Sequence, residues 1–174
     1  MPAMTELGLV TARAVEEEAR LVMRWRNDAR TRAASFHGEE KRWPAFFYEY
    51  RGYFEGSPVA PCFGVQGGAR VGFLRFRDCA DPLAADGSPR RVVDISINVA
   101  PESRGLGLGT ALIRAGTAFA LATADAVLAE VRPGNEASAR AFLAAGYARL
   151  ADGSHEVDGA ALPVERYLRT RRHP

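Results

Sequence analysis

The sequence predicts a mixed α/β (α+β) fold in which one central sheet is flanked by helices, in a single domain that spans residues 1–174. The chain has 174 residues, of which 47% are hydrophobic, and this is enough apolar material for a core. Segments with strand-like alternation and segments with helical spacing follow one another, without an internal repeat or a long linker. In the second half, an alternating strand leads through a glycine-rich turn into a helix.

The first part of the chain is expected to form a strand and two helices. Residues 7–15 have the pattern of a strand. Residues 16–36 show helical spacing after three acidic residues, which favour the start of a helix. The aromatic-rich residues 39–54 form the second expected helix, in which Pro44 is tolerated only in the first turn.

A hairpin and a further strand are expected next. Gly67 and Gly68 separate two apolar runs, residues 61–66 and 69–76, and a turn of two glycines favours a hairpin. Apolar and polar side chains alternate strictly in residues 91–99, which is typical of a strand with one buried face.

The last part of the chain predicts two further helices and three strands. A helix is expected from about Gly107, a strand at 126–131, a short helix within 135–146, and closing strands at 147–150 and 164–170. The predicted order is therefore strand, two helices, three strands, helix, strand, helix and two strands.

Three glycines, Gly105, Gly107 and Gly109, stand where the helix begins, although glycine costs a helix interior about 1 kcal/mol relative to alanine. The first N–H groups of a helix lack partners and attract anions, and glycine lets a diphosphate approach the backbone. Arg104 stands beside them, where a guanidinium can face phosphate. The spacing fits neither a Walker loop nor a dinucleotide fingerprint. The remaining alternative is a turn that only lets the helix pack closely on the sheet.

Two stretches carry a family resemblance. "VAPESRGLGLGTALI" contains R-x-x-G-x-G at Arg104, Gly107 and Gly109, and "AEVRPGNEASARAFLAAGY" follows after the intervening helix. Together they resemble the GNAT superfamily of N-acetyltransferases, most clearly from about residue 91 to 147. The resemblance implies the GNAT fold, with two parallel strands, 91–99 and 126–131, that splay apart.

The resemblance also implies that acetyl-CoA enters the gap between these two strands. Pantetheine would then bond main-chain groups of Ile97, Asn98 and Val99, and the N–H of Ile97 would polarise the thioester carbonyl. Asn135 matches an asparagine that contacts the cofactor in the family, and it is also a good helix N-cap. The diphosphate would lie on main-chain N–H groups of Arg104, Gly105, Leu106, Gly107, Leu108, Gly109 and Thr110.

Transfer of acetyl to an amine requires a group that takes the proton of the ammonium. Glu130 matches the general base of the ribosomal-protein alanine acetyltransferases in this family, and Asp94 is the alternative base. A proton relay through water, or no single base, is the third alternative. A solvated charge at a strand end is the structural alternative for Glu130. The family's general acid, a tyrosine twelve residues after the base, is replaced by Phe142. A thiol with a pKa near ~8.5 can nevertheless leave as thiolate, so the chemistry stays possible.

The resemblance implies that the acceptor binds to the first two helices, their connection and the last hairpin. The stretch "RWRNDARTRAASF" resembles the W-R-N start of amino-sugar acetyltransferases that act on nucleotide-linked sugars. Arg26 and His37 are therefore candidate contacts to the anionic tail of such a sugar, or else surface charges. The alternative functions are a protein N-terminal acetyltransferase, because "NEASAR" is similar to ribosomal-protein acetyltransferases, and a non-catalytic acyl-CoA-binding domain.

Composition excludes several other classes. The net charge of +2 gives no reason to expect a nucleic-acid partner, and no apolar run is long enough to cross a membrane. The three histidines show no metal-ligand spacing, so no metal is expected. The two cysteines fit small buried groups in a reducing compartment, so a cytoplasmic protein is expected. The expected partner, from the family resemblance, is a small-molecule amine. The sequence leaves a homodimer open.

Overall fold

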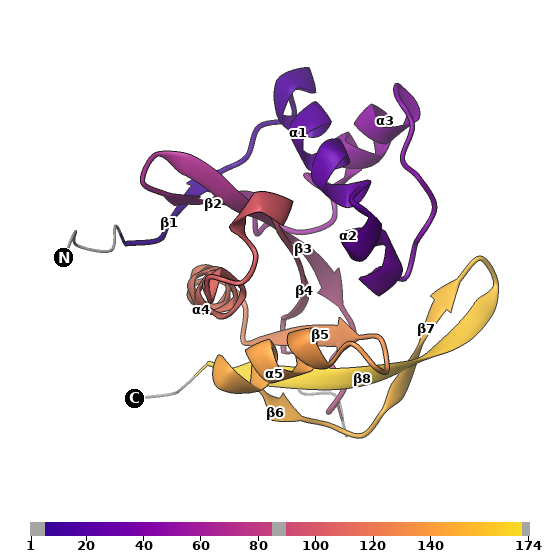
Figure 1. Cartoon of the computed structure of the whole chain (residues 1–174). Coiled ribbons are helices and arrows are strands. Elements are labelled where there is room, and N and C mark those ends of the chain that lie inside the picture. The colour runs from indigo at the N-terminus through magenta and orange to yellow at the C-terminus, as the bar shows by residue number, and fades with distance from the viewer. Residues whose placement is uncertain (1–5, 85–89, 172–174) are drawn as a thin grey trace.

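The computed structural model describes residues 6–84 and 90–171, and within them it has one mixed sheet with helices on both faces (Figure 1). The helices are α1 (Glu16–Arg26), α2 (Ala29–Ala34), α3 (Ala45–Gly52), the short 3-10 turn η1 (Pro101–Ser103), α4 (Leu108–Ala120) and α5 (Glu136–Ala144). The strands are β1 (Gly8–Thr11), β2 (Cys62–Gln66), β3 (Ala69–Cys79), β4 (Val92–Val99), β5 (Ala126–Val131), β6 (Ala148–Arg149), β7 (Gly153–Val157) and β8 (Ala160–Thr170).

The sheet has the strand order β1-β2-β3-β4-β5-β8-β6, and β7 pairs with β8. Only the pair β4–β5 is parallel, whereas the other strand pairs are antiparallel. The predicted single mixed sheet with parallel strands at 91–99 and 126–131 is therefore confirmed. The hairpin around Gly67 and Gly68 is confirmed as well. These two glycines, which both have positive φ, connect the end of β2 to the start of β3.

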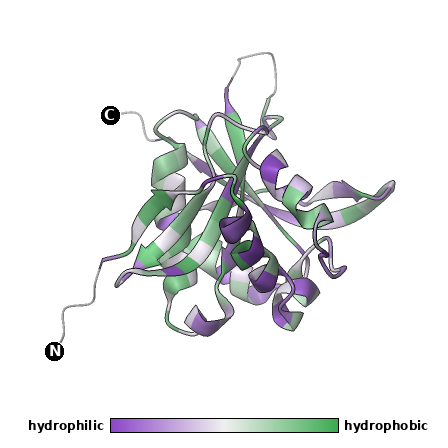
Figure 2. Cartoon of the chain, turned by 90° about the horizontal axis from the view of Figure 1, so that it is seen from above, coloured by the Kyte–Doolittle hydropathy of each residue, from purple (hydrophilic) through white to green (hydrophobic). Residues whose placement is uncertain are grey.

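Two apolar layers hold the helices against the sheet. On one face, α4 packs on β3 and β4, with Leu112 beside Leu74 and Ile95 in a cluster that extends under α5. On the other face, α1 and α3 pack on β2 and β3 through an aromatic cluster that includes Tyr50 and Phe73. Hydrophobic residues line the central strands, while hydrophilic residues gather on the outer helices (Figure 2). No helix among the described residues is long and apolar enough to cross a membrane.

The first expected helix is broken in two. The sequence predicted one helix over 16–36, but α1 ends at Arg26 and α2 starts at Ala29. The break is stabilised by side chains, because Asp28 caps α2 by accepting hydrogen bonds from the N–H groups of Arg30 and Thr31. The residue before it, Asn27, uses both ends of its amide for main-chain groups of Lys41. Propensity favoured a continuous helix, and these capping bonds outweigh it.

Two other boundaries differ from the prediction. The second helix begins only at Ala45, after Pro44, and in the preceding segment the main-chain groups of Lys41 are bonded to the side chain of Asn27. Near the C-terminus, β7 is an additional strand that pairs with β8 through a tight turn at Asp158 and Gly159, both of which have positive φ. An Asp-Gly pair between two strands favours a hairpin, so this turn was visible in the sequence.

Candidate active site

The parallel strands β4 and β5 separate after three residue pairs. Val92, Val93 and Asp94 pair with Ala126, Val127 and Leu128, and no later residues of the two strands are paired. On its other side β4 stays paired with β3 as far as Val99. One edge of residues 95–99 is therefore open toward a wedge-shaped gap, and its main-chain groups can accept a further extended chain as a strand would.

The glycine-rich turn lies where β4 leads into α4. Gly105 and Gly107 have φ values of 75° and 73°, a conformation that other residues rarely adopt. A Cβ at either position would meet no atom within 4 Å. Gly109 is also not tightly packed, since its nearest neighbour would be Val99 at 3.8 Å. Close packing on the sheet is instead the role of Gly116, where a Cβ would collide with Leu74.

The open space in front of these glycines is lined by unpaired donors. Gly107 is the N-cap of α4 and provides no side-chain cap, so the first N–H groups of the helix have no partner within it. No described group accepts a hydrogen bond from the N–H groups of residues 105–109. The turn thus combines free N–H groups, a helix N-terminus and space, which is what an anionic ligand requires.

The side chain of Arg104 does not point freely into this space. Its Nη2 donates to Asp28 Oδ2 and Thr31 Oγ1, both at 2.6 Å. The hydrogen bond from Arg104 is the main reason why the pKa of Asp28 lies below its ordinary value. The guanidinium therefore connects the glycine turn to the start of α2. Only its nitrogen atoms other than Nη2 are left to face a phosphate.

Glu130 lies at the end of β5, on the edge of the gap. Its Oε2 is 2.7 Å from His155 Nδ1, and both side chains are largely buried. The imidazole of His155 is stacked on Phe36, with 5.0 Å between the ring centroids. Glu130 Oε1 has no hydrogen-bond partner among the described residues, so one oxygen stays available to a ligand. This arrangement differs from a solvated charge at a strand end.

Asp94, the alternative base, lies on the neighbouring strand. Its Oδ2 is 3.3 Å from Nη2 of the exposed Arg77. Burial raises the pKa of the Cys79 thiol to about 12, and the charges of Asp94 and Glu130 add to this rise. Cys79 is half-buried and stands opposite Val92, at the end of β4 where this strand is still paired with β5.

Asn135 and Phe142 belong to α5. Asn135 caps this helix by accepting a hydrogen bond from the N–H of Ser138 at 3.3 Å, while its amide nitrogen has no partner among the described residues. Phe142 is buried and packs against Tyr147 and Tyr167. The residue in the usual position of the general acid is thus a core side chain.

The comparisons with known proteins decide the family. A family model described as the acetyltransferase (GNAT) family matches residues 19–147. The chain belongs to the GNAT family. A comparison with curated proteins finds no match.

Solved acetyltransferases share the fold of this GNAT protein at low sequence identity. The aminoglycoside acetyltransferase AAC(6′)-Ib, solved with coenzyme A, is 18% identical, with a TM-score of 0.79 and 95% of each chain covered. The spermidine N-acetyltransferase from Vibrio cholerae, solved with CoA and spermine, is 14% identical, with a TM-score of 0.73 and the same coverage. These likenesses extend the fold over nearly the whole chain.

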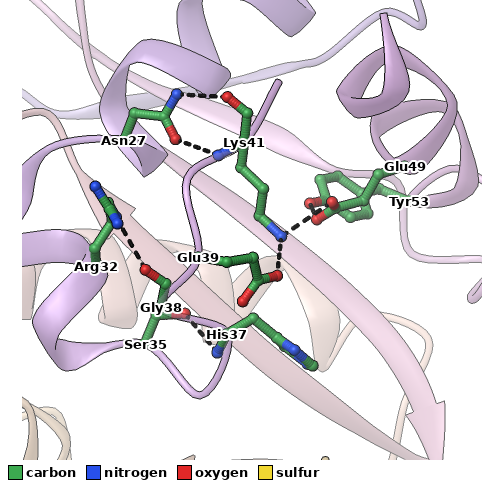
Figure 3. Close-up of polar contacts among 9 residues, drawn as sticks. All are labelled: Asn27, Arg32, Ser35, His37, Gly38, Glu39, Lys41, Glu49 and Tyr53. Carbon is green, nitrogen blue, oxygen red and sulfur yellow. Dashed lines mark hydrogen bonds and ion pairs between the residues drawn. The ribbon is translucent and has the colours of Figure 1, made fainter. Parts of the chain in front are cut away.

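The connection between α2 and α3 in this GNAT domain is held by a polar network (Figure 3). Lys41 Nζ lies 3.1 Å from both Glu39 Oε1 and Glu49 Oε2, and Tyr53 donates a hydrogen bond of 2.6 Å to Glu49. Burial by itself would raise the pKa of Glu49, but the hydrogen bonds from Tyr53 and Lys41 outweigh it and lower that pKa. The segment is fixed by charges and not by a regular element.

The structure separates the two expected acceptor contacts. Arg26 is the last residue of α1, and its charge contributes to lowering the pKa of Glu49 on α3. The main-chain N–H of His37 bonds Ser35, and its ring makes none of the contacts drawn in Figure 3. His155, and not His37, is the histidine beside a candidate base.

Two residues near the gap were missed by the sequence analysis. His155 was missed together with the strand β7 that carries it. Arg75 was missed although its strand alternates, with Leu74 and Phe76 in the core and Arg75 and Arg77 on the opposite face. That alternation was a usable signal. The described residues contain no group of three or more His, Cys, Asp or Glu side chains arranged for a metal ion.

Proposed function

We propose that this protein is an acetyl-CoA-dependent N-acetyltransferase that transfers acetyl directly to a primary amine of a small molecule. The observation that carries the proposal is the gap between β4 and β5, which has a turn with free N–H groups at one end and a hydrogen-bonded carboxylate, Glu130, on its edge. A cytoplasmic location belongs to the proposal, since Cys62 and Cys79 are both free thiols.

The residues around the gap fit acetyl-CoA. A Cβ at Gly105 or Gly107 would stand in open space, where a diphosphate can approach, and the N–H groups from Arg104 to Thr110 would hold it. The open edge of β4 would hold the pantetheine at Ile97, Asn98 and Val99. The amide nitrogen of Asn98 is buried without a partner, which leaves a donor on this strand for a ligand. When bound, acetyl-CoA supplies an acetyl thioester.

The chain's own residues then have three tasks. The N–H of Ile97 would polarise the thioester carbonyl, as an oxyanion-type donor. Glu130 would take the proton of the acceptor ammonium on its free Oε1, while His155 fixes the carboxylate through Oε2. The amine nitrogen would form the new C–N bond as the C–S bond breaks, and the sulfur would leave as thiolate or take a proton from water, since Phe142 offers none.

The finer proposal for the acceptor is a nucleotide-linked amino sugar. It rests on the W-R-N stretch and on Arg26 at the end of α1, a helix that packs on the face of the sheet opposite to α4. AAC(6′)-Ib and the spermidine N-acetyltransferase, which are named for small amines, support a small-molecule acceptor in general. A nucleotide-linked 4-amino sugar should have a higher kcat/KM than the free sugar, because its diphosphate anchors the reacting amine.

The test measures free CoA thiol after acetyl-CoA is mixed with amines of each class. Thiol release with a sugar or another small amine, and acetylated product by mass spectrometry, would support the proposal. Faster reaction with a ribosomal-protein N-terminal peptide would favour the protein acetyltransferase instead. Tight binding of acetyl-CoA without release for any amine would favour a non-catalytic acyl-CoA-binding domain, for which the missing tyrosine at Phe142 is the best argument.

A further inference from the structure

Arg75 is a partly buried cation without a carboxylate of its own. Its Nε is inaccessible to solvent and has no hydrogen-bond partner, and no ion pair reaches its guanidinium among the described residues. The group instead lies 4.6 Å from the ring centroid of Tyr53. Burial lowers the pKa of Arg75, and an unpaired charge in such a place normally destabilises a protein.

The nearby carboxylates are already in use. Glu49, on α3, binds Lys41 and accepts the hydrogen bond of Tyr53, as Figure 3 shows. Asp94 attracts Arg75 but pairs directly with Arg77. The charge of Arg26 also acts on Arg75 and repels it, and Arg26 has no ion pair among the described residues. No described carboxylate is therefore left to pair directly with Arg75.

A second arginine on the same strand shows the ordinary arrangement. Arg70 also lies over an aromatic ring, 4.5 Å from the centroid of Phe63. It differs from Arg75 because its Nη2 binds Glu18 at 2.9 Å, and this carboxylate is only 2% exposed. Arg77, the third arginine of β3, also has a carboxylate partner in Asp94, so Arg75 is the arginine of this strand that the described residues leave without one.

The position of Arg75 connects it with the reaction. In the β3–β4 register Arg75 stands opposite Ser96, and Arg77 stands opposite Asp94. Tyr53, Arg75, Arg77 and Asp94 line a small pocket between the end of α3 and these strands. Ser96 belongs to the part of β4 that borders the gap, so the main chain of Arg75 lies one strand spacing, roughly 4.8 Å, from that strand.

We propose that Arg75 binds an anionic group of the amine acceptor, a carboxylate or a phosphate. The fork of an arginine suits both groups, and a ligand there would supply the hydrogen bonds that Nε lacks. This inference rests on the proposed transferase function and restricts it, because the acceptor must carry both an amine and an anion. Polycationic amines are disfavoured at this subsite by the unpaired charge of Arg75.

The first experiment needs no turnover. The Nε–H signals of the arginines are followed by 15N NMR in protein saturated with coenzyme A, so that the glycine turn is occupied. Arg75→Lys identifies the Arg75 signal. Addition of inorganic phosphate or of succinate should shift that signal, while the signal of Arg70, which is bound to Glu18, should stay in place. An Arg75 signal that moves with neither anion would overturn the subsite.

The second experiment compares acceptors in matched pairs. Glucosamine 6-phosphate is compared with glucosamine, and L-phenylalanine with its carboxamide, so that phosphate and carboxylate are tested separately. At least one anionic member should be preferred, and Arg75→Gln should lower its kcat/KM by roughly 10- to 100-fold, as for a charge-assisted hydrogen bond. The neutral partner should be unaffected. Equal rates within both pairs would overturn the subsite and leave the transferase intact.

Stability distinguishes a binding role from a structural one. Arg70→Gln should lower the Tm, because Glu18 loses a cation, whereas Arg75→Gln should leave the Tm unchanged or raise it. A similar loss in both variants would mean that Arg75 is structural and would overturn the proposal. If the Arg75 signal shifts with an anion but no amine is acetylated, the subsite stands and the transferase proposal fails.

Discussion

Glu130 has one oxygen bound to His155 and one oxygen free, which is the arrangement that a positioned base needs. Glu130→Gln keeps the shape of the side chain but cannot take a proton. We expect kcat to fall by about 10²- to 10⁴-fold, the usual contribution of a general base, with nearly unchanged affinity for acetyl-CoA. Stopped-flow thiol release and calorimetry measure the two quantities. If Asp94→Asn loses activity and Glu130→Gln keeps it, the base is Asp94.

His155 acts on the amine only through Glu130, so it is a positioning residue. His155→Phe retains an aromatic ring for stacking on Phe36 and removes the hydrogen bond to the carboxylate. We expect a lower kcat, an unchanged KM for acetyl-CoA and an altered dependence of kcat on pH. In a Glu130→Gln background the same change should have little further effect, because residues that act as a unit are not additive. Additive losses would contradict the coupling.

The glycine turn allows a test of the donor site. Gly107→Val places a side chain in the open space before α4, and acetyl-CoA affinity should fall at least tenfold, about 1.4 kcal/mol. Valine is also strained at a φ of 73°, so a control is needed. Gly67→Val has a comparable positive φ in the β2–β3 hairpin and no atom within 4 Å. It should reproduce the loss of stability and leave affinity unchanged, as measured by calorimetry.

At the scale of elements, the break between α1 and α2 is held by side-chain hydrogen bonds to distant parts of the chain. Asn27 binds the main chain of Lys41, Arg104 binds Asp28, and Arg132 Nη1 donates to the carbonyl groups of Ala33 and Ser35. These bonds connect α2 and the segment after it to the glycine turn and to the end of β5. Side-chain bonds over such long sequence separations are absent from local propensity, which explains why one long helix was predicted.

The network around Lys41 predicts a pH-dependent stability. The pKa of Glu49 is lowered in the folded protein, so its contribution is present above the unfolded pKa and is lost as the pH falls through the folded pKa. Lys41→Met retains the stem of a side chain that is only 11% exposed and removes the charge. The Tm should fall at pH 7, and the difference from the parent should shrink below about pH 4.

The exposed pair Arg140–Glu136 provides the control for this measurement. Both of its side chains are mostly solvated, at 74% and 81% exposed, so Arg140→Met should barely change the Tm at either pH. A pH-independent loss in Lys41→Met would show that packing of the stem, and not its charge, holds the α2–α3 connection. Calorimetric melts between pH 3 and pH 7 distinguish the two explanations.

For the whole molecule, the sequence predicted best what depends on local patterns. The hairpin at Gly67, the strand β4, the glycine turn and α4 were all read correctly from alternation, helical spacing and glycine placement. The sequence could not predict the features that depend on the register between strands and on contacts between distant residues. Arg75 comes to the pocket because β3 pairs with β4, and His155 comes to Glu130 because β7 folds back on β8. The strands and the glycine turn that frame the candidate site were therefore predictable, whereas side-chain contacts such as that of His155 with Glu130 were not.

The sheet itself is nearly divided at the site. Strands β1–β4 and strands β5–β8 each have their own pairings, and only three residue pairs of β4 and β5 join the two groups. A ligand that pairs with the open edge of β4 would add contacts between the two groups of strands. Binding of acetyl-CoA should thus be visible in the stability of the whole molecule as well as at the site.

Acetyl-CoA at 100 times its Kd should stabilise the protein by about 2.7 kcal/mol, and the Tm should rise accordingly. Amide hydrogen exchange should slow at residues 95–99 of β4 and at the start of α4, where N–H groups gain partners. The strand pairs β2–β3 and β5–β8, which are already complete, should gain only the general protection that follows from higher stability. Protection spread evenly over the chain, or absent from residues 95–99, would show that the ligand does not lie along β4.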